Sequence, residues 1–265
     1  MRLSPDQLRR YWEDGFLAIP DFYSATETLA LQQEVERLQS VGLLRDVSTD
    51  AAQANLQLVA TWKHSELLRD IPFHPKVVAL VDQIVGAPAF LYFDQIFLKP
   101  GRHGAGTSWH QDNDYFQLRD PGKGVALWTA VHAATAANGA MRFIPGSFRE
   151  ALPHSRDPKS DHHVRCYPDE SKMRLAELPA GGIVLFTFNT AHATGSNDTD
   201  KMRAGFALHF ANVEGAKDAD IHFGRDGKPL EYIPGTSGKP LVSGPEATGG
   251  RAEYGVDCAA QWAHA

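Results

Sequence analysis

Cysteine is scarce in this chain of 265 residues, which contains only Cys166 and Cys258, far apart and outside any Cys-x-x-Cys pattern. This scarcity argues against a disulfide framework and a thiolate metal site, and it fits a reducing compartment. The sequence also lacks an apolar run long enough to cross a membrane. Its first residues lack the apolar core of a signal peptide. We therefore expect a soluble, cytoplasmic protein with no membrane partner.

Positive charge is not in excess either. The formal net charge is −6 and the sequence pI is about 6.0, so no global basic field attracts nucleic acid. A content of 43% hydrophobic and 22% charged residues is typical of a globular protein rather than a disordered or fibrous one. Because there is neither an internal repeat nor a long linker, we predict one domain over residues 1–265.

Residues 1–88 predict a mainly helical layer. The segments 4–7 (Ser-Pro-Asp-Gln) and 24–27 (Ser-Ala-Thr-Glu) are capping boxes, each of which begins a helix. Residues 75–85 predict a third helix, which begins at a proline and is followed by the helix-ending Gly86.

Residues 89–214 predict β-structure. Aromatic and β-branched runs bounded by proline and glycine predict strands at residues 90–98, 125–133, 140–144, 183–189 and 203–213. Strands that follow N-terminal helices indicate a β-sandwich or barrel with helices packed outside. Residues 215–265 are rich in glycine, proline and charge, and we expect this tail to wrap the surface.

One long connection, residues 153–170, stands out among the predicted strands. Loops of this length are typically lids or binding loops. Its polar side chains favour a hydrophilic substrate, and they are Arg156, Lys159, His162, His163 and Arg165.

Candidate metal ligands surround residues 104–116. In extended backbone, side chains two positions apart point the same way, so His110 and Asp112 can reach one metal ion. We place a third ligand at His192, after the predicted strand 183–189. Two histidines and one carboxylate on one face of an ion form the facial triad of non-haem Fe(II) oxygenases. The alternative interpretation is a surface hydrogen-bonded pair at His110 and Asp112 and a strand-end histidine at His192.

Together these segments resemble the phytanoyl-CoA dioxygenase family of Fe(II)/2-oxoglutarate oxygenases. The likeness begins at residues 11–16 (Tyr-Trp-Glu-Asp-Gly-Phe) and includes residues 110–112 (His-Gln-Asp) and 138–147 (Asn-Gly-Ala-Met-Arg-Phe-Ile-Pro-Gly-Ser). It ends in residues 192–203, where a hydroxyl side chain stands two residues after the histidine and an arginine eleven residues after it. The resemblance implies a double-stranded β-helix, a jelly-roll of the cupin type.

The resemblance also implies the roles of individual residues. His110, Asp112 and His192 would bind Fe(II), and Arg203, helped by Thr194, would bind the distal carboxylate of 2-oxoglutarate, a task suited to a planar bidentate donor. Trp128, Gln111 and Gln95 match positions near the cosubstrate. The alternatives are a rim salt bridge for Arg203 and core packing for Trp128. Four other histidines, His64, His74, His132 and His209, are interpreted as packing or surface residues.

The implied activity is oxidation of a small molecule with O2 and 2-oxoglutarate. Hydroxylation, ring closure and desaturation all remain open. The polar loop 153–170 favours a polar substrate, and we expect a step of bacterial secondary metabolism. Phe148 stands where family members often have histidine after Pro-Gly-Ser, so one polar contact is absent. Halogenating relatives lack the metal carboxylate, so the presence of Asp112 argues against halogenation. The rival hypothesis is a non-oxidative metal-binding cupin or a catalytically silent small-molecule binder.

Overall fold

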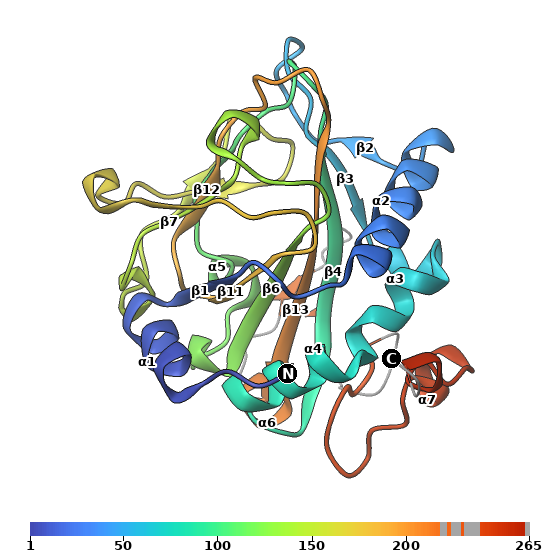
Figure 1. Cartoon of the computed structure of the whole chain (residues 1–265). Coiled ribbons are helices and arrows are strands. Elements are labelled where there is room, and N and C mark those ends of the chain that lie inside the picture. Colours follow the sequence, from blue (N-terminus) through green and yellow to red (C-terminus); the bar gives the residue numbers. More distant parts are fainter. Residues whose placement is uncertain (218–221, 224–228, 231–238, 263–265) are drawn as a thin grey trace.

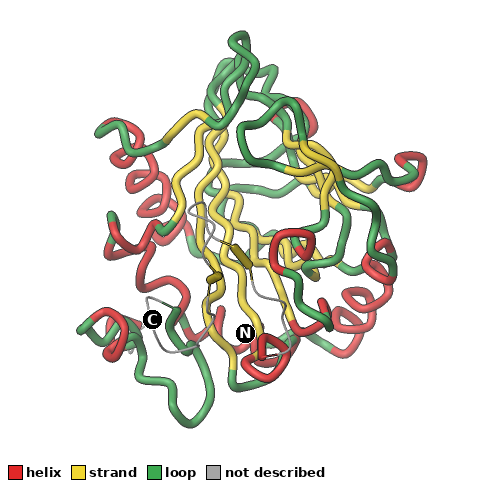
Figure 2. Tube along the Cα trace, turned by 180° about the vertical axis from the view of Figure 1, so that it is seen from behind, coloured by secondary structure: helices red, strands yellow, loops and turns green. Residues whose placement is uncertain are grey.

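Two antiparallel sheets packed face to face form the body of the protein in the computed structural model (Figures 1 and 2). The structure describes residues 1–217, 222–223, 229–230 and 239–262. Among these residues no helix is long and apolar enough to span a bilayer. The sandwich and its helical layer confirm the predicted mainly β fold with N-terminal helices.

The larger sheet has seven strands in the order β1-β11-β6-β13-β4-β3-β2, and the smaller one has four in the order β10-β7-β12-β5. The strands of the larger sheet are β1 (Phe16–Ile19), β2 (Arg45–Asp46), β3 (Leu56–Val59), β4 (Ala89–Lys99), β6 (Gly124–Ala130), β11 (Ile183–Thr187) and β13 (Arg203–Asn212). Those of the smaller sheet are β5 (Thr107–His110), β7 (Met141–Phe143), β10 (Arg174–Ala176) and β12 (His192–Thr194). Two short hairpins are β8 (Ser155–Arg156) with β9 (Val164–Arg165), and β14 (His222–Phe223) with β15 (Pro229–Leu230).

Helices α2, α3 and α4 lie along the outer face of the larger sheet, and α1 lies near β1 (Figure 1). The helices are α1 (Pro5–Asp14), α2 (Ala25–Ser40), α3 (Glu66–Asp70), α4 (Pro75–Ile84), α5 (Asn113–Phe116), α6 (Val213–Lys217) and α7 (Arg251–Tyr254). Both predicted capping boxes form: Ser4 and Ser24 accept hydrogen bonds from the third helical residue, whose side chain accepts one in return. These reciprocal bonds satisfy amide groups that would otherwise lack partners at the helix starts.

The larger sheet separates two cores because successive side chains of a strand point to opposite faces. On β13, Phe206, Leu208 and Phe210 pack against the helices. The alternate residues, Arg203, Ala207 and His209, face the space between the sheets. Polar residues of β13 are therefore held inside the sandwich while its apolar residues anchor the helical layer.

The described part of the C-terminal tail extends the larger sheet at β4. Strand β3 pairs only with residues 95–98 of β4, which leaves the first half of β4 without a neighbour on that side. There Leu91 N–H donates to Pro240 O at 3.0 Å and Val242 N–H donates to Ala89 O at 2.9 Å. The proposed division into layer, core and tail remains a prediction, and much of the tail lies outside the described residues.

Gly205 on β13 is required by the close approach of Trp128 on β6. A Cβ at this glycine would lie 2.3 Å from Trp128 Cζ2. We expect Gly205→Ala to lower the free energy of unfolding by about 1–3 kcal/mol, because overpacking displaces a buried ring. Urea denaturation measures the change. Gly122→Ala is the control, since its Cβ would meet only the Asp120 and Trp12 side chains; equal losses in both variants would contradict the packing argument.

Candidate active site

A cavity of about 510 Å³ lies between the two sheets. Strands of both sheets contribute to its wall, including Trp128 and Ala207 from the larger sheet and Met141 and Thr194 from the smaller one. The three predicted metal ligands line it, as do Arg203 and Gln95. The fold therefore gathers residues between Leu43 and His209, which are far apart in the sequence, around one cavity.

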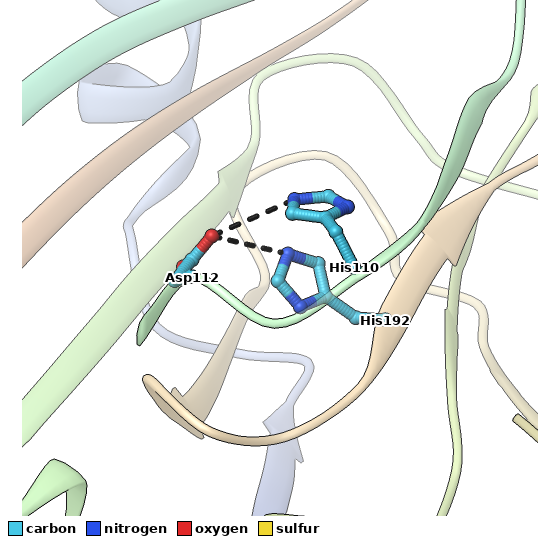
Figure 3. Close-up of side chains that lie close together, drawn as sticks. All are labelled: His110, Asp112 and His192. Carbon is cyan, nitrogen blue, oxygen red and sulfur yellow. Dashed lines mark ion pairs between the residues drawn. The ribbon is translucent and has the colours of Figure 1, made fainter. Parts of the chain in front are cut away.

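His110, Asp112 and His192 converge in this cavity, with ligand atoms that all lie within 4.8 Å of one another. Asp112 Oδ1 is 3.5 Å from His110 Nε2 and 3.6 Å from His192 Nε2. Figure 3 shows the carboxylate facing both imidazoles, which come from neighbouring strands. His192 and His110 are register partners of β12 and β5. Two neutral nitrogen donors and one anionic oxygen suit a divalent iron ion and leave other coordination positions open.

The backbone orients both imidazoles for metal binding. His110 Nδ1 lies 2.8 Å from Ser108 O, and His192 Nδ1 lies 2.9 Å from Thr190 O. A carbonyl oxygen can only accept, so each Nδ1–H donates and each Nε2 presents its lone pair to the centre of the cluster. The alternative of a surface hydrogen-bonded pair at His110 and Asp112 is excluded, because Asp112 and His192 are buried and the ligand atoms of all three side chains converge.

Electrostatics support the ligand states of His192 and Asp112, whereas at His110 burial, which lowers the pKa, is outweighed by the hydrogen bond and charge of Asp112, which raise the pKa of this imidazole. Burial lowers the pKa of His192 to about 4, which keeps this imidazole neutral near pH 7. Burial also opposes ionisation of Asp112, but the surrounding His192 and His110 hold the pKa of its carboxyl well below the usual range. The cluster thus offers an ionised carboxylate beside a neutral imidazole.

The local backbone differs from the extended geometry expected for residues 110–112. Strand β5 ends at His110, and Asp112 has φ −58° and ψ −29° at the start of the short helix α5. The two side chains meet because the chain turns between them, not because both stand on one face of a strand. The turn is held by Asn113 N–H, which donates to Phe188 O at 2.8 Å.

Two buried cations share the same cavity. Arg203 and Lys99 are register partners on β13 and β4, and each side chain is about 1% exposed. Within the described residues neither cation has a carboxylate partner; Arg203 donates to Asn138 O and Gly139 O, and Lys99 donates to Ala105 O. Burial lowers the pKa of Arg203 to about 9, and burial together with the charge of Arg203 lowers the pKa of Lys99 well below its usual range. A buried cation without a counter-ion is costly, so this end of the cavity is suited to an anion.

Two further predicted cosubstrate residues line the same cavity as this cation pair. The guanidinium carbon of Arg203 lies 5.6 Å from the centre of the Trp128 ring. Thr194 also lines the cavity, where its Oγ1 accepts a hydrogen bond from Thr107 N–H at 3.0 Å and keeps its own proton free to donate. Trp128 thus both packs in the inner core and supports the cation, and the rim salt bridge considered for Arg203 does not occur.

Gln111 does not reach the cavity. Its side-chain nitrogen donates to Asn189 O at 2.6 Å and Glu150 O at 2.8 Å, while its oxygen accepts from Leu152 N–H at 2.8 Å. These bonds tie the loop after β7 to the turn before β12. The cosubstrate role expected for Gln111 therefore has no geometric support, and the residue fixes the loop that precedes His192.

Gln95 does line the cavity, where its side-chain oxygen accepts from Gln57 at 2.8 Å. Sequence reasoning missed three residues of the site: Gln57, Lys99 and His209, the last of which lies 3.2 Å from Asp112 Oδ2. Odd-numbered positions along 93–99 and 203–209 share the inward face, so strand alternation around Arg203 was the signal that could have found Lys99 and His209.

The predicted lid contributes only part of its polar residues. His162 and His163 line the cavity, whereas Arg156 and Lys159 are exposed and Arg165 packs over Tyr167. Hairpin β8–β9 is tied to the site because Val164 N–H donates to Tyr115 Oη at 2.8 Å. A salt bridge between Arg45 and Asp161 joins the same hairpin to β2.

A jelly-roll sandwich that encloses two histidines and a carboxylate beside an unpaired cation defines the class of non-haem iron oxygenases that take an anionic cosubstrate. A sequence model of the phytanoyl-CoA dioxygenase (PhyH) family matches residues 11–205, a span that contains the triad and Arg203. The chain belongs to this family, and it is an Fe(II)- and 2-oxoglutarate-dependent oxygenase.

Several relatives are similar over most of the chain. An ectoine dioxygenase of Bordetella parapertussis is 26% identical over 238 residues, which cover 80% of this chain and 76% of the relative. An L-proline trans-4-hydroxylase of Streptomyces griseoviridis is 26% identical over 230 residues, covering 77% and 85%. The fold matches the crystal structure of the non-haem α-ketoglutarate-dependent epimerase SnoN from nogalamycin biosynthesis with a TM-score of 0.69 and 23% identity, covering 90% of this chain and 97% of that one.

Asp112 supplies the only anionic atom of the candidate triad, so its removal should abolish tight metal binding. Removing a residue that only hydrogen-bonds to a metal ligand lowers metal affinity by about 10- to 100-fold. We therefore expect Asp112→Ala, which removes a ligand itself, to weaken Fe(II) binding by more than about 100-fold. Anaerobic calorimetric titration measures the change. Asp114→Ala is the matched control, because Asp114 pairs with His154 and does not line the cavity. Undiminished iron binding by Asp112→Ala would exclude the carboxylate as a ligand.

Proposed function

We propose that this enzyme hydroxylates a small molecule, or closes a ring or introduces a double bond in it, at an iron ion held by His110, Asp112 and His192. The observation that carries the proposal is the juxtaposition of this buried triad with the unpaired cations Arg203 and Lys99 in one cavity. A protein that only bound a metal would have no need of a buried anion site. Burial of such basic groups is costly unless a ligand supplies the opposite charge.

Different residues of the cavity would bind the metal, the cosubstrate and the substrate. The triad would hold the metal, and Arg203 with Lys99 and Thr194 would bind the distal carboxylate of 2-oxoglutarate. Iron, 2-oxoglutarate and O2 together supply the oxidising power that breaks a substrate C–H bond, with succinate and CO2 as coproducts. The protein holds the substrate near the metal and excludes water from the site.

The substrate would occupy the rest of the cavity. Its wall is aromatic at Phe93, Phe97 and Tyr115, and polar at the Gln57–Gln95 pair. We infer a substrate with an apolar body, packed against the rings, and a polar group that the amides recognise. The relatives named for ectoine and L-proline support small cyclic amino-acid-like compounds, and SnoN supports a step in bacterial secondary metabolism.

Only two lid histidines reach the substrate space, so the expected hydrophilic substrate is supported less by the lid than by the amide pair.

We further propose a cytoplasmic location, because Cys166 and Cys258 are both free thiols.

Substitution of Arg203 tests whether this side chain binds 2-oxoglutarate. We expect anaerobic Fe(II)-loaded protein to develop a visible metal-to-ligand charge-transfer band on titration with 2-oxoglutarate. Arg203→Met should raise the 2-oxoglutarate concentration at half-maximal band by about 10- to 100-fold, since a hydrogen bond to a charged group contributes roughly 1.5–3 kcal/mol. Lys99→Met should act in the same direction.

Iron binding itself should persist in both variants, because neither side chain belongs to the triad. Arg149→Met is the matched control, as this exposed arginine packs on Phe148 outside the cavity. Unchanged 2-oxoglutarate binding by Arg203→Met would reject the assignment. If the iron-loaded parent protein develops no charge-transfer band, the result would favour the rival hypothesis of a non-oxidative metal-binding cupin.

A substitution of Gln95 tests whether this side chain contacts the substrate or the cosubstrate. A screen of ectoine, L-proline and related cyclic amino acids should reveal a compound that accelerates succinate formation. For that compound, Gln95→Leu should raise KM by about tenfold, because a buried hydrogen-bonding group of the substrate loses its partner. The charge-transfer band should not change. A weakened band with an unaltered substrate KM would instead assign Gln95 to the cosubstrate.

A further inference from the structure

A third histidine, His209, lies against Asp112, at the carboxylate oxygen that does not face the other two imidazoles. Oδ1 of the carboxylate faces His110 Nε2 at 3.5 Å and His192 Nε2 at 3.6 Å. Oδ2 faces His209 Nε2 at 3.2 Å. The two oxygens of one carboxylate therefore have different neighbours, and only one of them points into the candidate metal cluster.

Oδ2 of Asp112 is fully buried, and the described residues supply no aligned hydrogen bond to it. His209 Nε2 is at hydrogen-bonding distance from this oxygen. His209 Nδ1 is also buried without a partner. Because a neutral imidazole carries one N–H, its proton is best placed on Nε2, where it meets a carboxylate oxygen, and the bare nitrogen is Nδ1.

The fold holds the His209 ring in this position. His209 lies on the inward face of β13, opposite Phe93 on β4, and the ladder between these strands is irregular directly after it. Such irregularities re-aim side chains and occur beside active sites. Three aromatic rings surround the imidazole, with ring-centre distances of 5.8 Å to Phe93, 5.3 Å to Phe116 and 5.9 Å to Phe188. The ring therefore has little room to turn away from the carboxylate.

We propose that His209 is a positioning residue that donates Nε2–H to Asp112 Oδ2 and so restricts this carboxylate to one metal-binding oxygen. Outer partners of this kind orient ligands and tune metal affinity. A carboxylate that bound through both oxygens would occupy one of the positions that 2-oxoglutarate and O2 require. His209 would thus leave a coordination position free for 2-oxoglutarate or O2, and it would also strengthen metal binding. The proposal rests on the metal site of the proposed function and adds a residue to it.

The experiment compares two substitutions that differ only in whether a donor reaches Oδ2. Gln places an amide nitrogen near the position of imidazole Nε2, whereas Phe fills the same space without a donor. Apo protein is titrated anaerobically with Co(II) and with Fe(II), and the metal-loaded forms are then titrated with 2-oxoglutarate. Thermal unfolding of each apo variant shows whether it folds.

We expect His209→Phe to weaken metal binding by about 10- to 100-fold, and His209→Gln to remain within about threefold of the parent. The Phe variant should also need more 2-oxoglutarate to develop the charge-transfer band. Both variants should unfold cooperatively, since a ring or an amide of similar size occupies the pocket.

Two results would overturn the proposal. Parent-like metal binding by a folded His209→Phe would show that Oδ2 needs no donor. Equal weakening in folded His209→Phe and His209→Gln, with a changed Co(II) absorption spectrum, would make His209 a metal ligand itself. Failure of the parent protein to bind Co(II) or Fe(II) would instead reject the metal site, and with it the proposed function, which distinguishes the two failures.

Discussion

Charged groups buried between two sheets, away from water, are the constraint on which this structure depends. Within the described residues, the carboxylate of Asp112 faces imidazoles, Arg203 donates to backbone carbonyls beside the Trp128 ring, and Lys99 donates to a backbone carbonyl. Such groups are costly in the free protein and become favourable when ligands of opposite charge occupy the cavity. The enzyme is therefore preorganised for a cation at one end of the cavity and an anion at the other.

The sandwich maintains this arrangement by dividing each long strand into two faces. On β13 the outward residues Phe206 and Leu208 bind the helical layer, and this packing leaves the inward face free to carry polar groups. Gly205 and Ala207 are small, which gives Trp128 room to lie beside Arg203. Stability and function thus depend on the same strand but on opposite sides of it.

Loops complete the site where strands cannot. Asp112 stands in a turn, and Gln111 beside it anchors that turn to the segment before β12. The hairpin β8–β9 brings His162 and His163 over the substrate space through the contact of Val164 with Tyr115. Two of the candidate metal ligands and Arg203 lie on strands, whereas Asp112 and the two lid histidines come from connecting segments. Such connections can differ between family members without a change in the sheets.

The sequence by itself determined much of this picture: the capping boxes at Ser4 and Ser24 define helices locally, and the spacing of residues 192–203 indicates the family. It did not reveal the roles of Lys99 or His209: strand alternation can place each side chain on an inward face, but which strand lies opposite β13 depends on a non-local register. It also placed Gln111 near the cosubstrate, because adjacency in sequence does not show which way a side chain points once the chain turns. Long-range pairing decides those contacts, and it exists only in the folded protein.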